Sequence, residues 1–212
     1  RNDEGLTPIQ YCSKKGLFDN STVAAHCVWV DAEDTRILSE KSVGVAHNPI
    51  SNMILASGIC PVPELRNMGI NVGIGIDGAG SNDSQDMLQS IKITPLLQRV
   101  NKMQATALSS HDTLHMATIE GAKVLGVEKY LGSLEVGKRA DFVILDGDSP
   151  VLANIHDPFQ AVVYCAGKTE VKEVWVDGEN IFKDGKVTNV STYEVVKHSK
   201  SQALKLVEAA GL

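Results

Sequence analysis

The stretch Asn71-Val-Gly-Ile-Gly-Ile-Asp77-Gly-Ala-Gly-Ser-Asn-Asp83 decides the fold. Its first half is an apolar, glycine-interrupted run of strand length, which ends abruptly at Asp77 and is followed by a turn of small residues. This pattern is typical of a buried strand that delivers a carboxylate. In barrels of parallel strands the active site lies at the C-terminal strand ends, so Asp77 is a candidate metal ligand or general base. The simpler alternative is that Asp77 caps the next turn or helix.

Two similar units precede this strand. Each joins a short apolar run to a helix-like segment: strands in 22–30 and 42–47, helices in 31–40 and 62–68. Alternating strands and helices predict a parallel sheet with helical crossovers. A lone histidine in an apolar strand is more often a hydrogen-bonded core residue than a ligand. Here His26, His47 and Asp77 are all expected near one edge of the sheet, which favours a functional site.

Five pieces of the sequence form a specific combination, in order from about His26 to about Lys186. They are Ala-Ala-His26-Cys-Val, Val-Ala-His47-Asn-Pro-Ile-Ser-Asn52, Ala56-Ser-Gly-Ile-Cys-Pro-Val-Pro63, Gly-Ile-Gly-Ile-Asp77-Gly-Ala-Gly-Ser-Asn82 and Gly132-Ser-Leu-Glu-Val-Gly-Lys-Arg-Ala-Asp-Phe-Val-Ile-Leu-Asp146. Together they resemble the amidohydrolase superfamily. Within it, they are most similar to the branch of methylthioadenosine/S-adenosylhomocysteine deaminases and triazine chlorohydrolases.

The resemblance implies an α/β fold: the C-terminal part of a (β/α)8 TIM-like barrel plus part of a small β-sandwich. We expect the barrel half in residues 1–130, the sandwich portion in 131–190 and a C-terminal helix in 191–212. It also implies one divalent metal, zinc or iron. A bound metal lowers the pKa of water toward neutrality, so that a nearby carboxylate and imidazole can move the proton to a leaving group.

The same resemblance implies roles for four residues. Asp77 corresponds to a metal ligand that also takes the proton of the attacking water, and His26 to a histidine that holds the hydroxide or polarises the reacting group. His47 and Asn52 correspond to positions near the pocket and are candidates for substrate contact. For His47, a histidine satisfied by neighbouring backbone at a strand end is an equally good interpretation.

Two motifs of the family do not occur in this sequence. The family's other metal ligands are a His-x-His pair and a histidine three residues before a catalytic glutamate, and neither pattern is present. Catalytic metal sites normally use at least three protein ligands, so we expect this chain to be the C-terminal half of a longer enzyme and inactive alone. Three parallel strands leave an unpaired edge, which predicts a partner: the missing half or another copy of the chain.

The predicted function is metal-dependent hydrolysis at a heteroaromatic carbon, which displaces ammonia from an adenosine-type base. A triazine-type chlorohydrolase or aminohydrolase is the alternative within enzymes, because the shared motifs do not separate the two. A hypothesis from another class of function is that the chain is an isolated, non-catalytic fragment that only associates with a partner.

Composition excludes some other classes of function. The 212 residues are 43% hydrophobic and carry a formal net charge of -6, with no basic cluster for nucleic acid or an anionic membrane. No apolar run approaches the length of a membrane span. The four cysteines, at positions 12, 27, 60 and 165, show no C-x-x-C spacing. We therefore expect reduced thiols in a cytoplasmic protein.

The remaining segments carry local signals. Thr7 and Pro8 predict the start of a helix, and residues 48–63 are expected to form a loop that lines the site. Residues 84–100 are expected to form a helix that is bent or broken at Pro95, and residues 110–127 a further helix. Strands are expected within 137–146, 161–165, 171–176 and 181–187, with a hairpin turn at Asp177-Gly178. From Ser191 an amphipathic helix offers apolar side chains for packing: Tyr193, Val196, Leu204, Leu206 and Val207.

Overall fold

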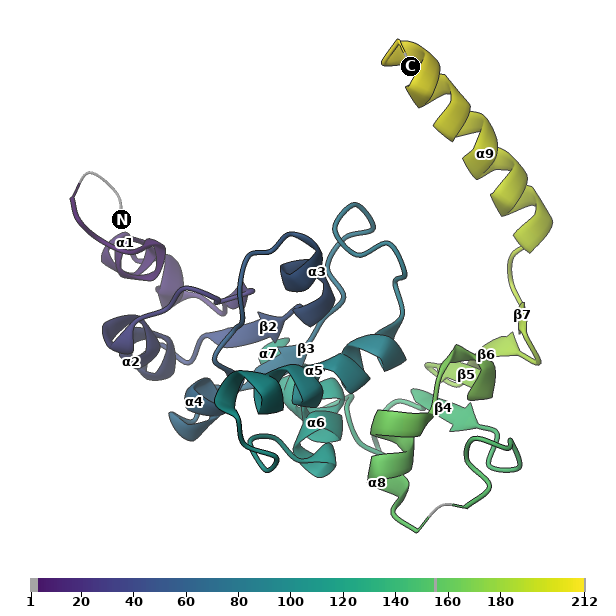
Figure 1. Ribbon diagram of the computed structural model, residues 1–212, viewed down its shortest axis with the longest axis horizontal. Coiled ribbons are helices and arrows are strands. Elements are labelled where there is room, and N and C mark those ends of the chain that lie inside the picture. The colour runs from purple at the N-terminus through teal and green to yellow at the C-terminus, as the bar shows by residue number, and fades with distance from the viewer. Residues whose placement is uncertain (1–3, 155, 212) are drawn as a thin grey trace.

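The computed structural model describes residues 4–154 and 156–211 (Figure 1). It contains a three-stranded sheet of order β1-β2-β3 and a four-stranded sheet of order β4-β5-β6-β7. The first sheet lies among the helices of the N-terminal part of the chain, and the second lies toward the C-terminal part (Figure 1). None of the helices in the described ranges is long and apolar enough to cross a membrane.

The first sheet is parallel, as the alternation of strands and helices predicted. Its strands are β1 (Val23–Ala25), β2 (Gly44–His47) and β3 (Val72–Ile74). Ala24 pairs with Val45, and Val45 pairs with Val72. Paired residues of neighbouring strands point to the same face of the sheet. Ala24, Val45 and Val72 therefore share one face, where they pack in one core cluster with residues of the neighbouring helices. Because the three strands are parallel, their C-terminal ends lie at the same edge of the sheet.

The helices around this sheet begin with the residues that the sequence predicted. They are α1 (Pro8–Lys14), α2 (Ala32–Glu40) and α4 (Val62–Asn67). Thr7 caps α1 by accepting from the backbone N–H of Gln10, with Pro8 at the first helical position. The Thr7 hydroxyl also donates to the buried carboxylate of Asp34 in α2. One residue therefore starts α1 and joins it to α2.

Two predictions for this region were wrong. The expected strand in 22–30 ends at Ala25, because His26 and Cys27 have left-handed backbones with φ of 69° and 44°. The segment 48–63, expected as a loop, contains helix α3 (Pro49–Ile54). Pro49 occupies the first helical position, where its fixed φ suits a helix and its missing N–H is not needed.

The predicted helix over 110–127 is also interrupted. It is divided into α6 (Ser110–Ala117) and α7 (Ile119–Val124), because Thr118 has φ -128° and ψ -103°, which no helix allows. The break lets Glu120 of α7 accept a 2.9 Å hydrogen bond from the backbone N–H of Val72, and the same carboxylate pairs with Arg66. The break between α6 and α7 is therefore accompanied by contacts of Glu120 with Val72 and Arg66.

Helix α5 (Met87–Lys102) starts after the N-cap Asp86 and continues through Pro95. Of the two predicted effects of Pro95, a bend or a break, the break is therefore absent. One face of α5 buries polar residues at helical spacing, with Ser90, Thr94 and Gln98 fully buried. Thr94 donates its hydroxyl proton to the carbonyl of Ser90 at 2.8 Å, and Gln98 donates to the carbonyl of Cys60 at 3.0 Å.

The second sheet is antiparallel. Its strands are β4 (Phe142–Leu145), β5 (Val171–Val176), β6 (Glu179–Lys183) and β7 (Lys186–Val187). The predicted hairpin turn at Asp177-Gly178 joins β5 to β6, with positive φ at both residues as a tight hairpin requires. The strand expected at 161–165 was wrong: Ala161–Cys165 is a π-helical turn that continues α8 (Pro158–Gln160). The sandwich remains a prediction.

Helix α9 (Thr192–Ala209) confirms the helix predicted after Ser191. It lies apart from both sheets (Figure 1), and all of its residues are exposed. Its apolar side chains are therefore available to a partner surface rather than packed on the described part of this chain. The remaining short elements are 3-10 turns at Leu17–Asp19 and Lys168–Glu170.

Candidate active site

Asp77 lies just beyond the C-terminal end of β3. The chain continues the parallel pairing past the strand, because Gly75 N–H donates to the carbonyl of His47 at 2.8 Å. At Asp77 the backbone turns into the left-handed region, with φ 61°. Aspartate tolerates this conformation better than most side chains, and it ends the strand with the carboxylate at the sheet edge.

Two donors hold the Asp77 carboxylate. The Ser51 hydroxyl donates to Oδ2 at 2.6 Å, and the backbone N–H of Gly78 donates to Oδ1 at 2.8 Å. These hydrogen bonds, with that of Ser51 the largest cause, lower the pKa of Asp77 to about 2. The side chain is 29% exposed, so an ionised carboxylate at the edge of the sheet remains open to a ligand.

His26 follows β1 directly and approaches Asp77. Its Nε2 lies 3.6 Å from Asp77 Oδ2, and its Nδ1 lies 2.8 Å from the side-chain oxygen of Asn52. The backbone N–H of His26 donates to the carbonyl of Ala46 at 2.9 Å, which ties this turn to β2. The structure therefore brings together His26, Asn52 and Asp77 from three separate segments of the chain.

Helix α3 supplies both neighbours of this pair. Ser51 contacts Asp77, and the adjacent Asn52 contacts His26. Ser51 is the residue that sequence reasoning missed, although it stands inside the quoted piece between His47 and Asn52. The signal was available in Asn48-Pro49, since proline after a capping-type residue often begins a helix.

His47 lies at the end of β2 and is fully buried. Neither of its ring nitrogens has a hydrogen-bond partner within the described ranges. Burial, and secondarily the charge of His26, lowers the pKa of His47 to about 4. The ring is therefore neutral at pH 7 and sealed inside the protein, in contrast to the open His26 and Asp77.

Metal donors are few in this arrangement. Within residues 4–154 and 156–211, no group of three or more His, Cys, Asp or Glu side chains is arranged to hold a metal ion. Asp77 offers one open, ionised carboxylate, which is a donor type that zinc accepts. His111 and His115, four residues apart on α6, stack with ring centroids 4.6 Å apart and gain no third ligand.

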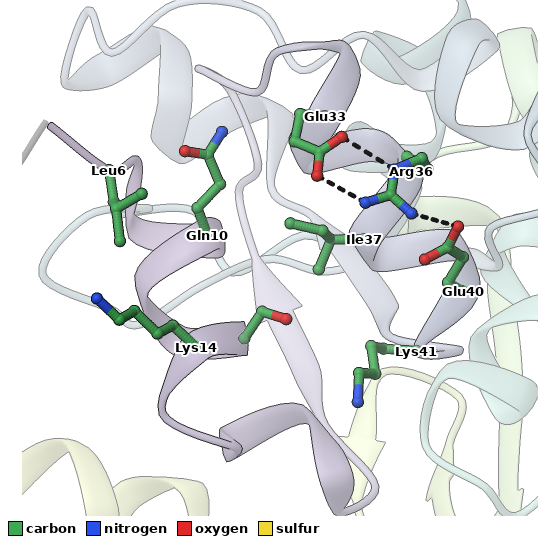
Figure 2. Close-up of a pocket in the computed structure, with 9 residues that line it drawn as sticks. Leu6, Gln10, Lys14, Glu33, Arg36, Ile37, Glu40 and Lys41 are labelled. Atoms are coloured by element: carbon green, nitrogen blue, oxygen red, sulfur yellow. Dashed lines mark hydrogen bonds and ion pairs between the residues drawn. The ribbon is translucent and has the colours of Figure 1, made fainter.

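A hollow of about 430 Å³ lies between α1 and α2 (Figure 2) and does not include the site residues. Its charged side chains have partners: Arg36 bridges Glu33 and Glu40, as the dashed lines of Figure 2 show. Lys14 pairs with Glu4, and Lys41 pairs with Asp19. Since these charges are neutralised locally, the hollow offers no evident site for a charged ligand.

Residues 2–181 match the amidohydrolase family. The chain belongs to this family. The amidohydrolase relatives in curated collections include the 5'-deoxyadenosine deaminase of Methanopyrus kandleri, 44% identical over 209 residues that cover 99% of this chain and 48% of that protein. The 5-methylthioadenosine/S-adenosylhomocysteine deaminase of Desulforudis audaxviator is 42% identical over 97% of this chain and 48% of its own length. The chain thus spans about half the length of the curated relatives it matches.

Solved amidohydrolase structures agree with this assignment. An adenosine deaminase from Xanthomonas campestris with bound zinc superimposes with a TM-score of 0.92 at 30% identity, covering 96% of this chain and 46% of that chain. Atrazine chlorohydrolase from Arthrobacter aurescens complexed with zinc superimposes with a TM-score of 0.86 at 26% identity, and the match covers 93% of this chain and 44% of that chain. The α/β fold is therefore similar to that of amidohydrolase enzymes, and the predicted resemblance is confirmed.

Proposed function

We propose that this chain supplies the His26–Asp77 part of the active site of a zinc-dependent deaminase that acts on the purine ring of an adenosine-type nucleoside. The observation that carries the proposal is the 3.6 Å approach of His26 Nε2 to the ionised carboxylate of Asp77. Relatives named as deaminases of 5'-deoxyadenosine and of 5-methylthioadenosine/S-adenosylhomocysteine support this substrate class.

In this proposal Asp77 is a ligand of the zinc ion. Ser51 and the Gly78 N–H keep its carboxylate ionised and oriented, which a metal ligand requires. Bound zinc would lower the pKa of water toward neutrality. The remaining ligands would come from the half of the amidohydrolase fold that this chain does not carry. Zinc is favoured over iron because two similar solved structures, the adenosine deaminase and the atrazine chlorohydrolase, contain zinc.

Asp77 and His26 would then move one proton. As a water oxygen bonds to the ring carbon, its proton passes to the Asp77 carboxylate, and the His26 imidazole orients the same oxygen. The carbon–nitrogen bond breaks, and this proton leaves with the amino group as ammonia, while the second proton of the water ends on the adjacent ring nitrogen as the carbonyl forms. Water and the amine are consumed, and the ring carbonyl and ammonia are formed. His47 and Asn52 remain candidates for substrate contact under this proposal.

The proposal includes a partner for the parallel sheet. In the described ranges β1 pairs with β2 alone and β3 pairs with β2 alone, so both outer edges are open. Parallel strands of this kind are normally buried inside a closed layer. The complementary half of the fold is the proposed partner, with a second copy of the chain as the competing possibility. The division at residues 130 and 190, and the cytoplasmic location, remain predictions.

The test is hydrolysis by the whole protein that contains this chain, loaded with zinc. It is incubated with 5'-deoxyadenosine, 5'-methylthioadenosine, S-adenosylhomocysteine and a chlorotriazine, and released ammonia and chloride are measured. Ammonia from the nucleosides supports the proposal. Chloride release without deamination would instead support the triazine hydrolase alternative. A protein that holds no stoichiometric zinc and hydrolyses nothing would overturn the proposal in favour of a fragment that only associates.

A further inference from the structure

We propose that Asn52 is a positioning residue that holds the proton of His26 on Nδ1, so that Nε2 presents its lone pair to the site. The side-chain oxygen of Asn52 lies 2.8 Å from His26 Nδ1. An amide oxygen can only accept a hydrogen bond, so Nδ1 must carry the donated proton. The second nitrogen, Nε2, faces Asp77 Oδ2 at 3.6 Å.

The position of Asn52 is fixed by its surroundings. It is 1% exposed, and it lies in α3, where its backbone N–H donates to the carbonyl of Asn48 at 3.0 Å. Its own carbonyl accepts from Ser57 N–H at 2.8 Å. A buried side chain on a hydrogen-bonded helix has little freedom to turn away. The 2.8 Å contact with His26 is therefore a constraint on the imidazole rather than a passing surface contact.

His26 needs such a constraint. Its ring stands on a left-handed turn just outside β1, with 39% of the side chain exposed, and the neighbouring Cys27 is also left-handed. An exposed imidazole at a turn can rotate and can carry its proton on either nitrogen. The adjacent Ser51 holds Asp77 in the same way that Asn52 holds His26. One turn of α3 therefore orients both groups of the site relative to each other.

The consequence for catalysis rests on the proposed function. With Nδ1 held by the Asn52 oxygen, the lone pair of Nε2 accepts a hydrogen bond from the attacking water and orients it, while Asp77 takes the proton. No proton is gained or lost over a turnover, since Nε2 ends in its starting state. If Nδ1 lost its acceptor, the ring could place its proton on Nε2 toward Asp77, and Nε2 could then no longer accept a hydrogen bond from the water.

The test measures the ring nitrogens of His26 by 15N NMR in the whole zinc-loaded protein, with 15N-labelled histidine at pH 8. Comparison with the His26→Gln variant assigns the signals. We expect a pyrrole-type shift at Nδ1 and a pyridine-type shift at Nε2. Asn52→Asp, which keeps an acceptor oxygen, should retain this pattern. Asn52→Leu should move the proton toward Nε2. Met53→Ala is the matched control, because it changes the other neighbour of Asn52 on α3 at an exposed position.

Kinetics in the same variants separate this inference from the proposed function. For Asn52→Leu we expect kcat for deamination to fall about 10- to 100-fold with KM nearly unchanged, as for other residues that orient a reacting group. An unprotonated Nδ1 in the unmodified protein would overturn the inference even if Asn52→Leu fails to fold. An unchanged tautomer in a folded Asn52→Leu variant would overturn it too. The expected NMR pattern in a protein without deaminase activity would leave the positioning role standing and reject the function.

Discussion

The Ser51 hydroxyl donates a 2.6 Å hydrogen bond to Asp77 Oδ2, although the two residues stand 26 positions apart in the sequence. The contact joins α3, which follows β2, to the turn that follows β3. It is the largest cause of the low pKa of Asp77. The charge state of the candidate metal ligand is therefore set by a residue from a neighbouring strand–helix connection.

Removal of this hydroxyl should weaken metal binding. For Ser51→Ala we expect zinc affinity to fall about 10- to 100-fold, because partners that hydrogen-bond a ligating carboxylate orient it and keep it ionised. The measurement is competition for zinc against a chelator in the whole protein. Ser81→Ala serves as a comparison on the other side of Asp77, where the hydroxyl makes a smaller contribution to the pKa. Equal zinc affinity in Ser51→Ala and the unmodified protein would contradict the proposed role.

Asp77→Asn should abolish hydrolysis and loosen the metal. Asparagine has nearly the same shape and also tolerates the left-handed backbone, so the fold should be preserved while the anionic donor is lost. Zinc content by elemental analysis and ammonia release measure the two effects. Asp83→Asn makes the same change of charge at an exposed position of the same loop and should alter neither. Full activity in Asp77→Asn would reject Asp77 as a catalytic residue.

His47 predicts a pH dependence of stability. Its pKa is about 4 in the fold against about 6.5 when exposed, so the unfolded chain binds the extra proton between these values. Stability should therefore fall as pH decreases from about 6.5 to about 4, by about 3 kcal/mol from this residue. His47→Leu should flatten that part of the curve in urea unfolding. His198→Gln, on the exposed face of α9, should not change it.

Gly75 should not tolerate a side chain. A Cβ at this position would lie 2.3 Å from Oδ1 of the buried Asn48, which must then turn away from the junction between β2 and β3. We expect Gly75→Ala to destabilise the fold by about 1–3 kcal/mol, as overpacking usually does. Gly80→Ala is the matched control, since a Cβ there meets nothing within 4 Å. Thermal or urea unfolding of the two variants gives the comparison, and equal stabilities would show that the junction adjusts freely.

The carboxylate of Glu120 should be important for the start of β3. It accepts from Val72 N–H at 2.9 Å and from Arg66 at 3.1 and 3.2 Å, and its side chain is 12% exposed. Glu120→Gln leaves the Arg66 charge with Asp112 alone in this network, and we expect a loss on the order of 3 kcal/mol. Glu33→Gln breaks an exposed pair with Arg36 and should change urea unfolding little. Similar losses in both variants would contradict the special role of Glu120.

Much of the site was predictable because its signals are local. An acidic residue that ends an apolar run marked Asp77, and a histidine beside a similar run marked His26. The two missing motifs predict an incomplete set of metal ligands, which stays a prediction. Ser51 was missed because a lone serine in the first turn of a helix carries no catalytic signal until its contact with Asp77 is known.

Five pieces of the sequence determined the family. The sequence by itself also determined the alternation of strands and helices that forms the first sheet, the capped start of α1 and the hairpin turn at Asp177-Gly178. These features depend on residues within a few positions of one another, such as Thr7 and Pro8. Only the tertiary structure decided the interruption at Thr118 and the pairing of Ser51 with Asp77 and of Asn52 with His26. Those depend on the register of three parallel strands and on left-handed turns at their ends, which bring together residues 26 positions apart. Local propensity carries no information about contacts over that separation.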